Sequence, residues 1–253
     1  MYLKVIACEI AARELYFTAA RSPHLIDLEL LTQGYHDTPV KGRDAIQERI
    51  NAVPAGKYEA IVLGYGLCSN ILAGLTTPHT RLVIPRAHDC ITFFLGSKER
   101  YQQCFSERPG TYYYTSGWLE CARRRGLEFS AWAGVSLPAG SNLVPKAPYE
   151  EWVRKYGEDQ AKYLLEEMGR WSAAYSHGTL IDFDFSKPLK LDEEVKRICR
   201  DKGWKYSELP GSLDLLEKLL GGDWTGSLVV QPGQKVVATY DDQVIGVEGT
   251  GKG

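Results

Sequence analysis

Short apolar runs alternate with longer amphipathic segments along the first half of this 253-residue chain. Residues 3–7, 60–63 and 82–84 are such runs; they are rich in β-branched side chains and end in polar or Gly-rich clusters, which favours buried strands. Residues 24–32 alternate apolar and polar side chains and predict a further strand. Between the strands, apolar positions recur at helical spacing, for example over residues 42–53. This alternation predicts βαβ units, and therefore an α/β fold with a mainly parallel, Rossmann-like sheet and helices on both faces.

The other segments of the chain predict further strands and helices, which complete a first α/β half and form a second one. Residues 126–148 are rich in Gly, Ala, Ser and Pro, and we expect a long loop there. Residues 148–175 predict a long amphipathic helix, and residues 228–240 predict a hairpin around a Pro-Gly turn. Further strands are expected over 110–115, 179–185 and 204–209, and further helices over 69–75, 91–105, 192–202 and 213–220. We therefore expect two α/β halves, residues 1–125 and 126–253, that share one cleft or form one continuous domain.

The composition is that of an ordinary globular protein, with 44% hydrophobic and 25% charged residues. The net charge of −2 predicts no nucleic-acid or anionic-membrane partner, so we expect a small-molecule substrate. The longest apolar runs are far shorter than the roughly 20 residues that span a bilayer. The first residues lack the pattern of a signal peptide, and we expect a cytoplasmic protein.

Thiols and imidazoles stand at the predicted strand ends. Cys8, His36, Cys68 and the pair His88 and Cys90 each fall just after a predicted parallel strand. Because the carboxyl ends of parallel strands meet at one edge of a sheet, we expect these side chains to converge. Thiolate and imidazole are ligands that late transition metals favour, so the set predicts a metal site, with zinc as the first candidate. The alternative for each cysteine is a packed, small apolar residue.

Charged residues accompany these ligands. Glu9, Asp89 and Glu120 are candidates for orienting a ligand or carrying a proton. Arg86 and Asp89 belong to a run of polar residues that is costly beside an apolar strand unless its charges are paired or used. We therefore count Glu9, Asp89 and Arg86 as catalytic candidates. The alternative is an Arg86–Asp89 ion pair in which Asp89 caps the next helix.

A Gly-rich turn follows the strand predicted over residues 60–63. Such a turn exposes backbone N–H groups to an anionic part of a cofactor, and it could lower the pKa of Cys68 and make this thiol nucleophilic. The spacing is neither that of a GxGxxG dinucleotide motif nor that of a P-loop, so a simple tight turn is the alternative. The candidate cofactor-binding residues are Gly64, Gly66, Ser69, Asn70 and, from a later strand end, Trp118.

The same clusters carry a family resemblance. They are residues 6–9, 33–36, 64–70, 84–91, 110–113 and 117–118. Together they resemble the prokaryotic family catalogued as domain of unknown function 1638, over residues 3–220. In the family pattern, glycine is usual where Ser69 stands and proline where Ser116 stands. The resemblance implies an association with corrinoid-dependent one-carbon methyl transfer, and hence a corrinoid or methyltransferase protein as partner.

Three functional hypotheses follow. The first is a metal-binding α/β protein, an enzyme or an auxiliary protein, in which Cys68, His88 and either Cys90 or Cys8 hold the metal. His36 is a further candidate ligand. The second is a metal-free transferase or hydrolase with Cys68 as nucleophile and His88 as base. The third is a noncatalytic module that binds a cofactor or a partner protein.

Overall fold

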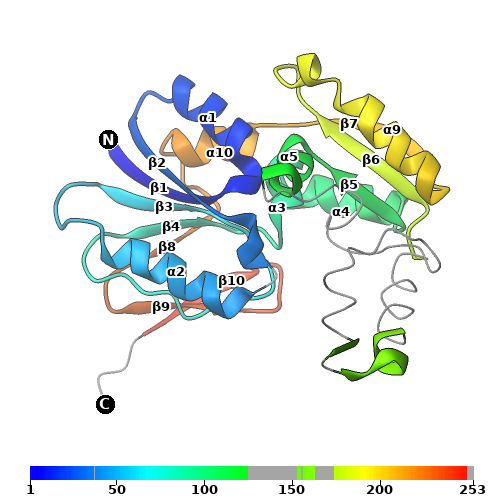
Figure 1. Cartoon of the computed structure of the whole chain (residues 1–253). Coiled ribbons are helices and arrows are strands. Elements are labelled where there is room, and N and C mark those ends of the chain that lie inside the picture. The colour runs from blue at the N-terminus through cyan, green and yellow to red at the C-terminus, as the bar shows by residue number, and fades with distance from the viewer. Residues whose placement is uncertain (37, 125–152, 155, 163–173, 250–253) are drawn as a thin grey trace. The chain divides into compact units, whose positions relative to one another are not determined.

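The computed structural model describes residues 1–36, 38–124, 153–154, 156–162 and 174–249 (Figure 1). The loop expected over 126–148 and most of the helix expected over 148–175 lie outside these residues. Contacts divide the chain into two compact units, one formed by Met1–Gln102 with Gly211–Gly253 and the other by Gln103–Pro210. The first unit is thus discontinuous in sequence, whereas the expected halves are continuous.

The first unit is built on a five-stranded sheet in the order β2-β1-β3-β4-β8. The first four strands are parallel and β8 runs antiparallel to β4, which confirms the mainly parallel α/β fold. Every residue of β3 and β4 is buried, as the continuous apolar runs predict for central parallel strands. The strands are β1 (Tyr2–Cys8), β2 (Leu25–Leu31), β3 (Ala60–Gly64), β4 (Leu82–Pro85) and β8 (Ser227–Val230).

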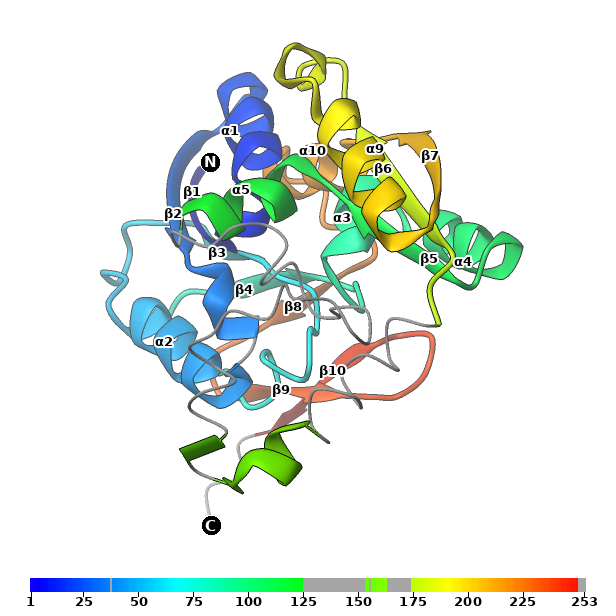
Figure 2. The same ribbon diagram turned by 45° about the vertical axis from the view of Figure 1, so that its right-hand side comes forward.

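Helices cover both faces of this sheet (Figures 1 and 2). α1 (Ala12–Arg21) and α10 (Asp214–Leu220) pack together on one face, and α2 (Pro39–Asn51) covers the other. α2 buries Ile46 and Ile50 against the sheet, together with side chains from the antiparallel pair β9 (Gln234–Ala238) and β10 (Ile245–Gly249). The shorter elements are the 3-10 turns η1 (Glu9–Ala11) and η2 (Gln33–His36) and the helix α3 (Cys90–Leu95).

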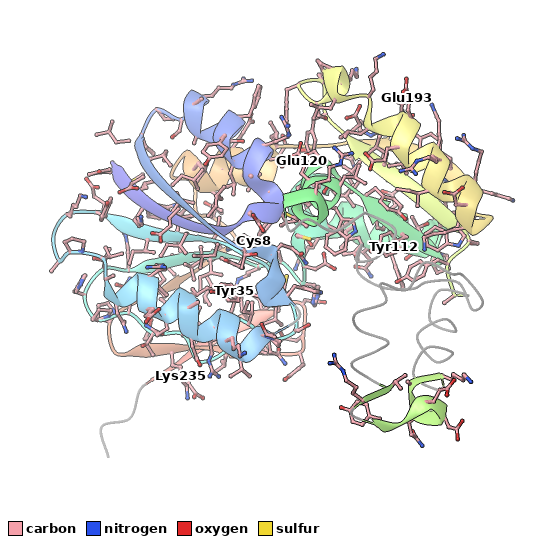
Figure 3. All side chains as sticks on the ribbon, in the orientation of Figure 1. Cys8, Tyr35, Tyr112, Glu120, Glu193 and Lys235 are labelled. Atoms are coloured by element: carbon pink, nitrogen blue, oxygen red, sulfur yellow. The ribbon has the colours of Figure 1, made fainter. Side chains whose placement is uncertain are left out.

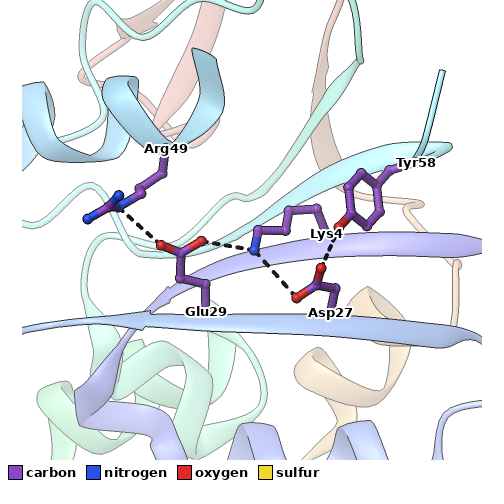
Figure 4. Close-up of polar contacts among 5 residues, drawn as sticks. All are labelled: Lys4, Asp27, Glu29, Arg49 and Tyr58. Carbon is purple, nitrogen blue, oxygen red and sulfur yellow. Dashed lines mark hydrogen bonds and ion pairs between the residues drawn. The ribbon is translucent and has the colours of Figure 1, made fainter. Parts of the chain in front are cut away.

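A polar network ties the edge strand β2 to its neighbours (Figure 4). Lys4 of β1 pairs with Glu29 at 2.9 Å and with Asp27 at 3.5 Å, and both acids lie on β2. Arg49 of α2 contacts Glu29 at 3.1 Å, and the hydroxyl of Tyr58 donates to Asp27. The acidic positions of the alternating pattern over residues 24–32 thus lie where Lys4 and Arg49 neutralise their charge. Tyr58 adds a hydrogen bond to one of these acids.

The second unit contains a parallel sheet in the order β5-β6-β7. Its core combines β-strand tyrosines with the apolar face of α9, including Tyr114, Leu180 and Val195. The elements are α4 (Lys98–Glu107), which crosses the unit boundary, β5 (Thr111–Tyr114), α5 (Ser116–Arg124), β6 (His177–Asp182), η3 (Lys187–Leu189), α9 (Leu191–Lys202) and β7 (Lys205–Pro210).

Three local predictions were wrong. Residues 69–75 form turns rather than a helix. The single helix expected over 91–105 is broken into α3 and α4 at Gly96, whose φ of 84° ends α3 in the left-handed conformation. The hairpin expected over 228–240 does not form, because β8 pairs with β4 while β9 pairs with β10.

Candidate functional site

The candidate site lies at the carboxyl ends of β1, β3 and β4, which are adjacent in the sheet. Cys8 is the last residue of β1, Cys68 lies in the turn after β3, and Cys90 begins α3 after β4. All three thiols are partly buried. α3 packs against η1, which brings Cys90 towards the end of β1, and the charges of Cys8 and Cys68 both act on Cys90. The three cysteines therefore share one edge of the sheet, and their meeting at a single point stays a prediction.

Two backbone segments cross closely at the site. The N–H of Leu67 donates to the carbonyl of Ala87 at 2.8 Å, and the N–H of Cys68 donates to the carbonyl of His88 at 2.9 Å. A Cβ atom on Gly66 would stand 2.7 Å from the Cα of Asp89, so only glycine allows this approach. Gly66 thus holds the turn that carries Cys68 against the loop that leads to Cys90.

The turn after β3 has an unusual backbone. Cys68, Ser69 and Asn70 have φ values of 35°, 57° and 65°, so three consecutive non-glycine residues are left-handed. The N–H of Ile71 closes this turn on the carbonyl of Leu67 at 3.0 Å. Each such residue costs about 1–2 kcal/mol relative to the right-handed form. Strain of this kind collects at functional sites, where the surrounding structure maintains it.

Asp89 is bound into the loop rather than directed to solvent. Its Oδ1 accepts from the N–H of Ile91 at 3.0 Å and caps α3, as expected, and its Oδ2 accepts from the hydroxyl of Tyr101 at 3.1 Å. Arg86 donates instead to the carbonyls of Gln243 and Ile245. The alternative of an Arg86–Asp89 ion pair is therefore wrong, and Arg86 anchors the segment around β10 to the end of β4.

Burial disfavours the ionised forms of the thiol and carboxyl side chains at this site. Burial raises the pKa of the Cys68 thiol to about 12; the charge of Asp89 adds to the rise, and N–H groups of Cys90 and Gly66 oppose it. This is the opposite of the lowered pKa expected from the turn. Burial likewise raises the pKa of Cys90, with Cys68, Asp89 and Cys8 adding to the effect, and it raises the pKa of Asp89. The charges that act on Cys68 and Cys90 thus come from other acidic groups.

Tyr65 is a residue of this site that the sequence interpretation did not single out. It follows β3 directly, is 4% exposed, and its hydroxyl has no hydrogen-bond partner among the residues that the structure describes. Burial raises its pKa, and the neighbouring charges that contribute are first those of Cys8 and Cys68. The available signal was an aromatic hydroxyl between two glycines at the end of a buried strand.

The sequence model of the family DUF1638, described as a protein of unknown function, matches residues 30–220. The chain belongs to the DUF1638 family. The matched range includes Cys68, His88 and Cys90 and begins after Cys8. Comparisons with curated proteins and with solved structures return no match. Within the described ranges, no helix has the length and apolar character needed to cross a membrane.

Ser69, where the family resemblance leads us to expect glycine, has a φ of 57°. Only glycine adopts this conformation without a steric penalty. Ser69 and Asn70 are both exposed, and asparagine tolerates the left-handed region better than most residues. In this member of the family, the turn is therefore under more strain than glycine would impose.

The two predicted imidazoles, His36 in η2 and His88, are exposed, whereas the three thiols are partly buried. Glu9 does not face solvent as a free acid, because its Oε1 accepts from the N–H of Gln33 at 2.9 Å and from the hydroxyl of Thr32 at 3.1 Å. It thereby fastens η2 to the end of β1. Among the described residues, no three His, Cys, Asp or Glu side chains are already arranged to hold a metal ion.

The other two candidates, Trp118 and Glu120, lie on α5 in the second unit. The indole N–H of Trp118 donates to the hydroxyl of Tyr112 at 3.1 Å. Tyr112 also contacts the rings of Tyr175 and Trp204, at centroid distances of 5.3 and 5.9 Å. Trp118 thus belongs to an aromatic cluster of the second unit.

Proposed function

We propose that this DUF1638 protein binds a transition-metal cation, with zinc as the first candidate, through Cys8, Cys68 and Cys90. The observation that carries the proposal is the position of three partly buried thiols at the carboxyl ends of three adjacent strands, with acidic groups acting on Cys68 and Cys90. Burial and these neighbouring acidic groups disfavour the thiolate forms of Cys68 and Cys90. A bound cation would remove both penalties and convert the thiols to thiolates.

Three thiolates would leave a fourth position of the metal open. A site with three protein ligands and an open position is of the catalytic rather than the structural kind. The metal would then act as a Lewis acid on a small molecule bound at that position. Asp89, whose pKa is raised by burial and whose charge acts on Cys68, is the candidate proton carrier beside the metal.

Binding would require small movements of the side chains, because the ligands are not yet assembled around one point. It would also release protons, since thiols with raised pKa values must ionise to coordinate a metal. Metal affinity should therefore increase with pH. The exposed imidazoles of His36 and His88 are not part of this ligand set.

Elemental analysis tests the proposal directly. Protein purified without oxygen and without a metal-chelating tag should carry about one equivalent of metal, and Cys68→Ser and Cys90→Ser should each lose most of it. Cys104→Ser is the matched control, because Cys104 is also partly buried but lies on α4, outside the strand ends. Wild-type protein that holds no metal and takes up no added zinc, iron, cobalt or nickel would contradict the proposal.

The metal-free alternative, with Cys68 as nucleophile, has less support. A nucleophilic thiol needs a lowered pKa, whereas burial raises the pKa of Cys68, and the proposed base His88 is exposed. If metal is absent, fast and selective alkylation of Cys68 at neutral pH would favour this alternative. The link to corrinoid-dependent methyl transfer stays an expectation from the family resemblance.

A further inference from the structure

We infer that Tyr65 is a ligand-binding residue of the thiol site, and that its hydroxyl donates a hydrogen bond to an oxygen atom of the molecule bound there. This inference rests on the proposed metal function and deepens it, because it assigns the chemistry of the ligand at the open position. The ligand would present oxygen, as a water, carboxylate or carbonyl group does.

A buried hydroxyl without a partner is costly. Tyr65 is 4% exposed, and no residue in the described part of the chain accepts from its hydroxyl. Native proteins pair the large majority of such groups, and an exception calls for an explanation such as an ordered water, an ion or a catalytic role. The phenol stays protonated because burial raises its pKa, so it is available as a donor.

The surroundings of the Tyr65 hydroxyl belong to the strand ends. The groups whose charges act on it are Cys8, Cys68, Tyr35 and Glu9. Cys8, Tyr35 and Cys68 also pack against the hydrophobic core that includes Tyr65. Figure 3 labels Cys8, at the end of β1, and Tyr35, in η2. The unpaired hydroxyl of Tyr65 therefore lies among side chains of the strand ends that include Cys8 and Cys68.

Tyr58 provides an internal comparison, because it lies two residues before β3, whereas Tyr65 directly follows it. Tyr58 is 7% exposed, and its hydroxyl donates to Asp27 (Figure 4). The same side chain is thus satisfied at the amino end of the strand and unsatisfied at the carboxyl end. Ligands of open parallel sheets bind beyond the carboxyl ends, which agrees with an acceptor supplied from outside the chain.

The acceptor should be oxygen rather than sulfur. Sulfur accepts hydrogen bonds weakly, whereas water, carboxylate and carbonyl oxygens are strong acceptors. We expect the oxygen to reach Tyr65 as part of a group held by the metal. Solvent and an organic molecule both offer this chemistry, and the experiment below distinguishes them.

The test compares Tyr65→Phe with the matched variant Tyr58→Phe. Without metal, Tyr65→Phe should melt at or above the wild-type temperature, because it removes an unsatisfied polar group. Tyr58→Phe should melt lower, because it removes the donor to Asp27. A lower melting temperature for Tyr65→Phe would overturn the inference, since it would reveal a partner within the chain.

The second readout uses Co²⁺ as the metal and acetate as an oxygen-donor probe. In wild-type protein, acetate should change the visible Co²⁺ spectrum, and Tyr65→Phe should weaken acetate binding about five- to tenfold, as loss of one hydrogen bond predicts. Methanethiol should bind both proteins within about twofold, because sulfur is a weak acceptor. This pattern supports an organic oxygen ligand.

Two other results are informative. If acetate has no effect but Tyr65→Phe alone alters the Co²⁺ spectrum, Tyr65 bonds a metal-bound water, and the inference holds with solvent as the ligand. Identical spectra and affinities in wild type and Tyr65→Phe would overturn the inference and leave the metal site intact. Failure of the wild type to bind Co²⁺ would instead overturn the proposed metal function, so the two failures are distinguishable.

Discussion

Replacing Gly66 by alanine should destabilise the first unit more than any exposed glycine substitution. The new Cβ would lie 2.7, 2.8 and 2.9 Å from the Cα, C and N atoms of Asp89. These are backbone atoms, so no side-chain rotation can relieve the overlap. The loop around Asp89 must instead move away from the turn that carries Cys68.

The size of the effect follows from two contributions. Overpacking of this kind costs about 1–3 kcal/mol. Separation of the segments would also weaken the hydrogen bonds from Leu67 to Ala87 and from Cys68 to His88, at 2.8 and 2.9 Å, each with a net value of about 1 kcal/mol. We therefore expect Gly66→Ala to lower the free energy of unfolding by about 2–4 kcal/mol.

Urea unfolding followed by circular dichroism measures this change. Gly249→Ala is the control, because a Cβ at Gly249 meets nothing within 4 Å, and its effect should stay within about 0.5 kcal/mol. If Gly66→Ala unfolds at the same urea concentration as Gly249→Ala, the close crossing of the two segments does not constrain the fold and our reasoning is wrong. The variant should also lose metal, because Gly66 positions Cys68.

Two further predictions concern the turn and the polar network. Ser69→Gly should raise the free energy of unfolding by about 0.5–1 kcal/mol in the same assay. The reason is that glycine removes the steric cost of the left-handed conformation, and this gain exceeds the extra conformational entropy that glycine loses on folding. A lower free energy of unfolding would show that Ser69 makes a necessary contact. The hydrogen bond from Tyr58 lowers the pKa of Asp27, so the stability from this bond is present above the unfolded-state pKa of about 4 and is lost as pH falls through the lower, folded-state value. Tyr58→Phe should therefore show a shallower loss of stability than the wild type between about pH 5 and pH 2, and parallel curves would contradict the assignment.

Much of the architecture could be predicted because it depends on local patterns. The buried runs at β3 and β4 lack any polar position, and only a central strand of a parallel sheet accommodates such runs. Parallel strands carry their carboxyl ends to one edge, so the position of Cys8, Cys68 and Cys90 at that edge followed from the strand predictions alone. The cap formed by Asp89 is equally local, since its partner Ile91 lies two residues away.

The wrong predictions concern contacts between distant segments. The pairing of β8 with β4 joins residues more than 140 positions apart, and the hairpin pattern at 228–240 contains no information about that partner. The side chain of Arg86 donates to the carbonyls of Gln243 and Ile245. The local charges alone point to the neighbouring Asp89 as its partner. The turn at residues 68–70 is left-handed next to the close crossing at Gly66, although only Asn70 among its residues tolerates that conformation well.

The sequence by itself determined the class of fold, the family and the edge of the sheet at which the thiols lie. The tertiary structure alone decided the chemical state of that edge. Burial by surrounding segments raises the pKa of Cys68 and leaves the hydroxyl of Tyr65 without a partner in the described residues. The same arrangement of segments leaves His36 and His88 exposed to solvent. The physical reason is that a periodic pattern specifies which face of an element is buried, whereas desolvation and hydrogen bonding depend on atoms contributed by residues far away in the chain.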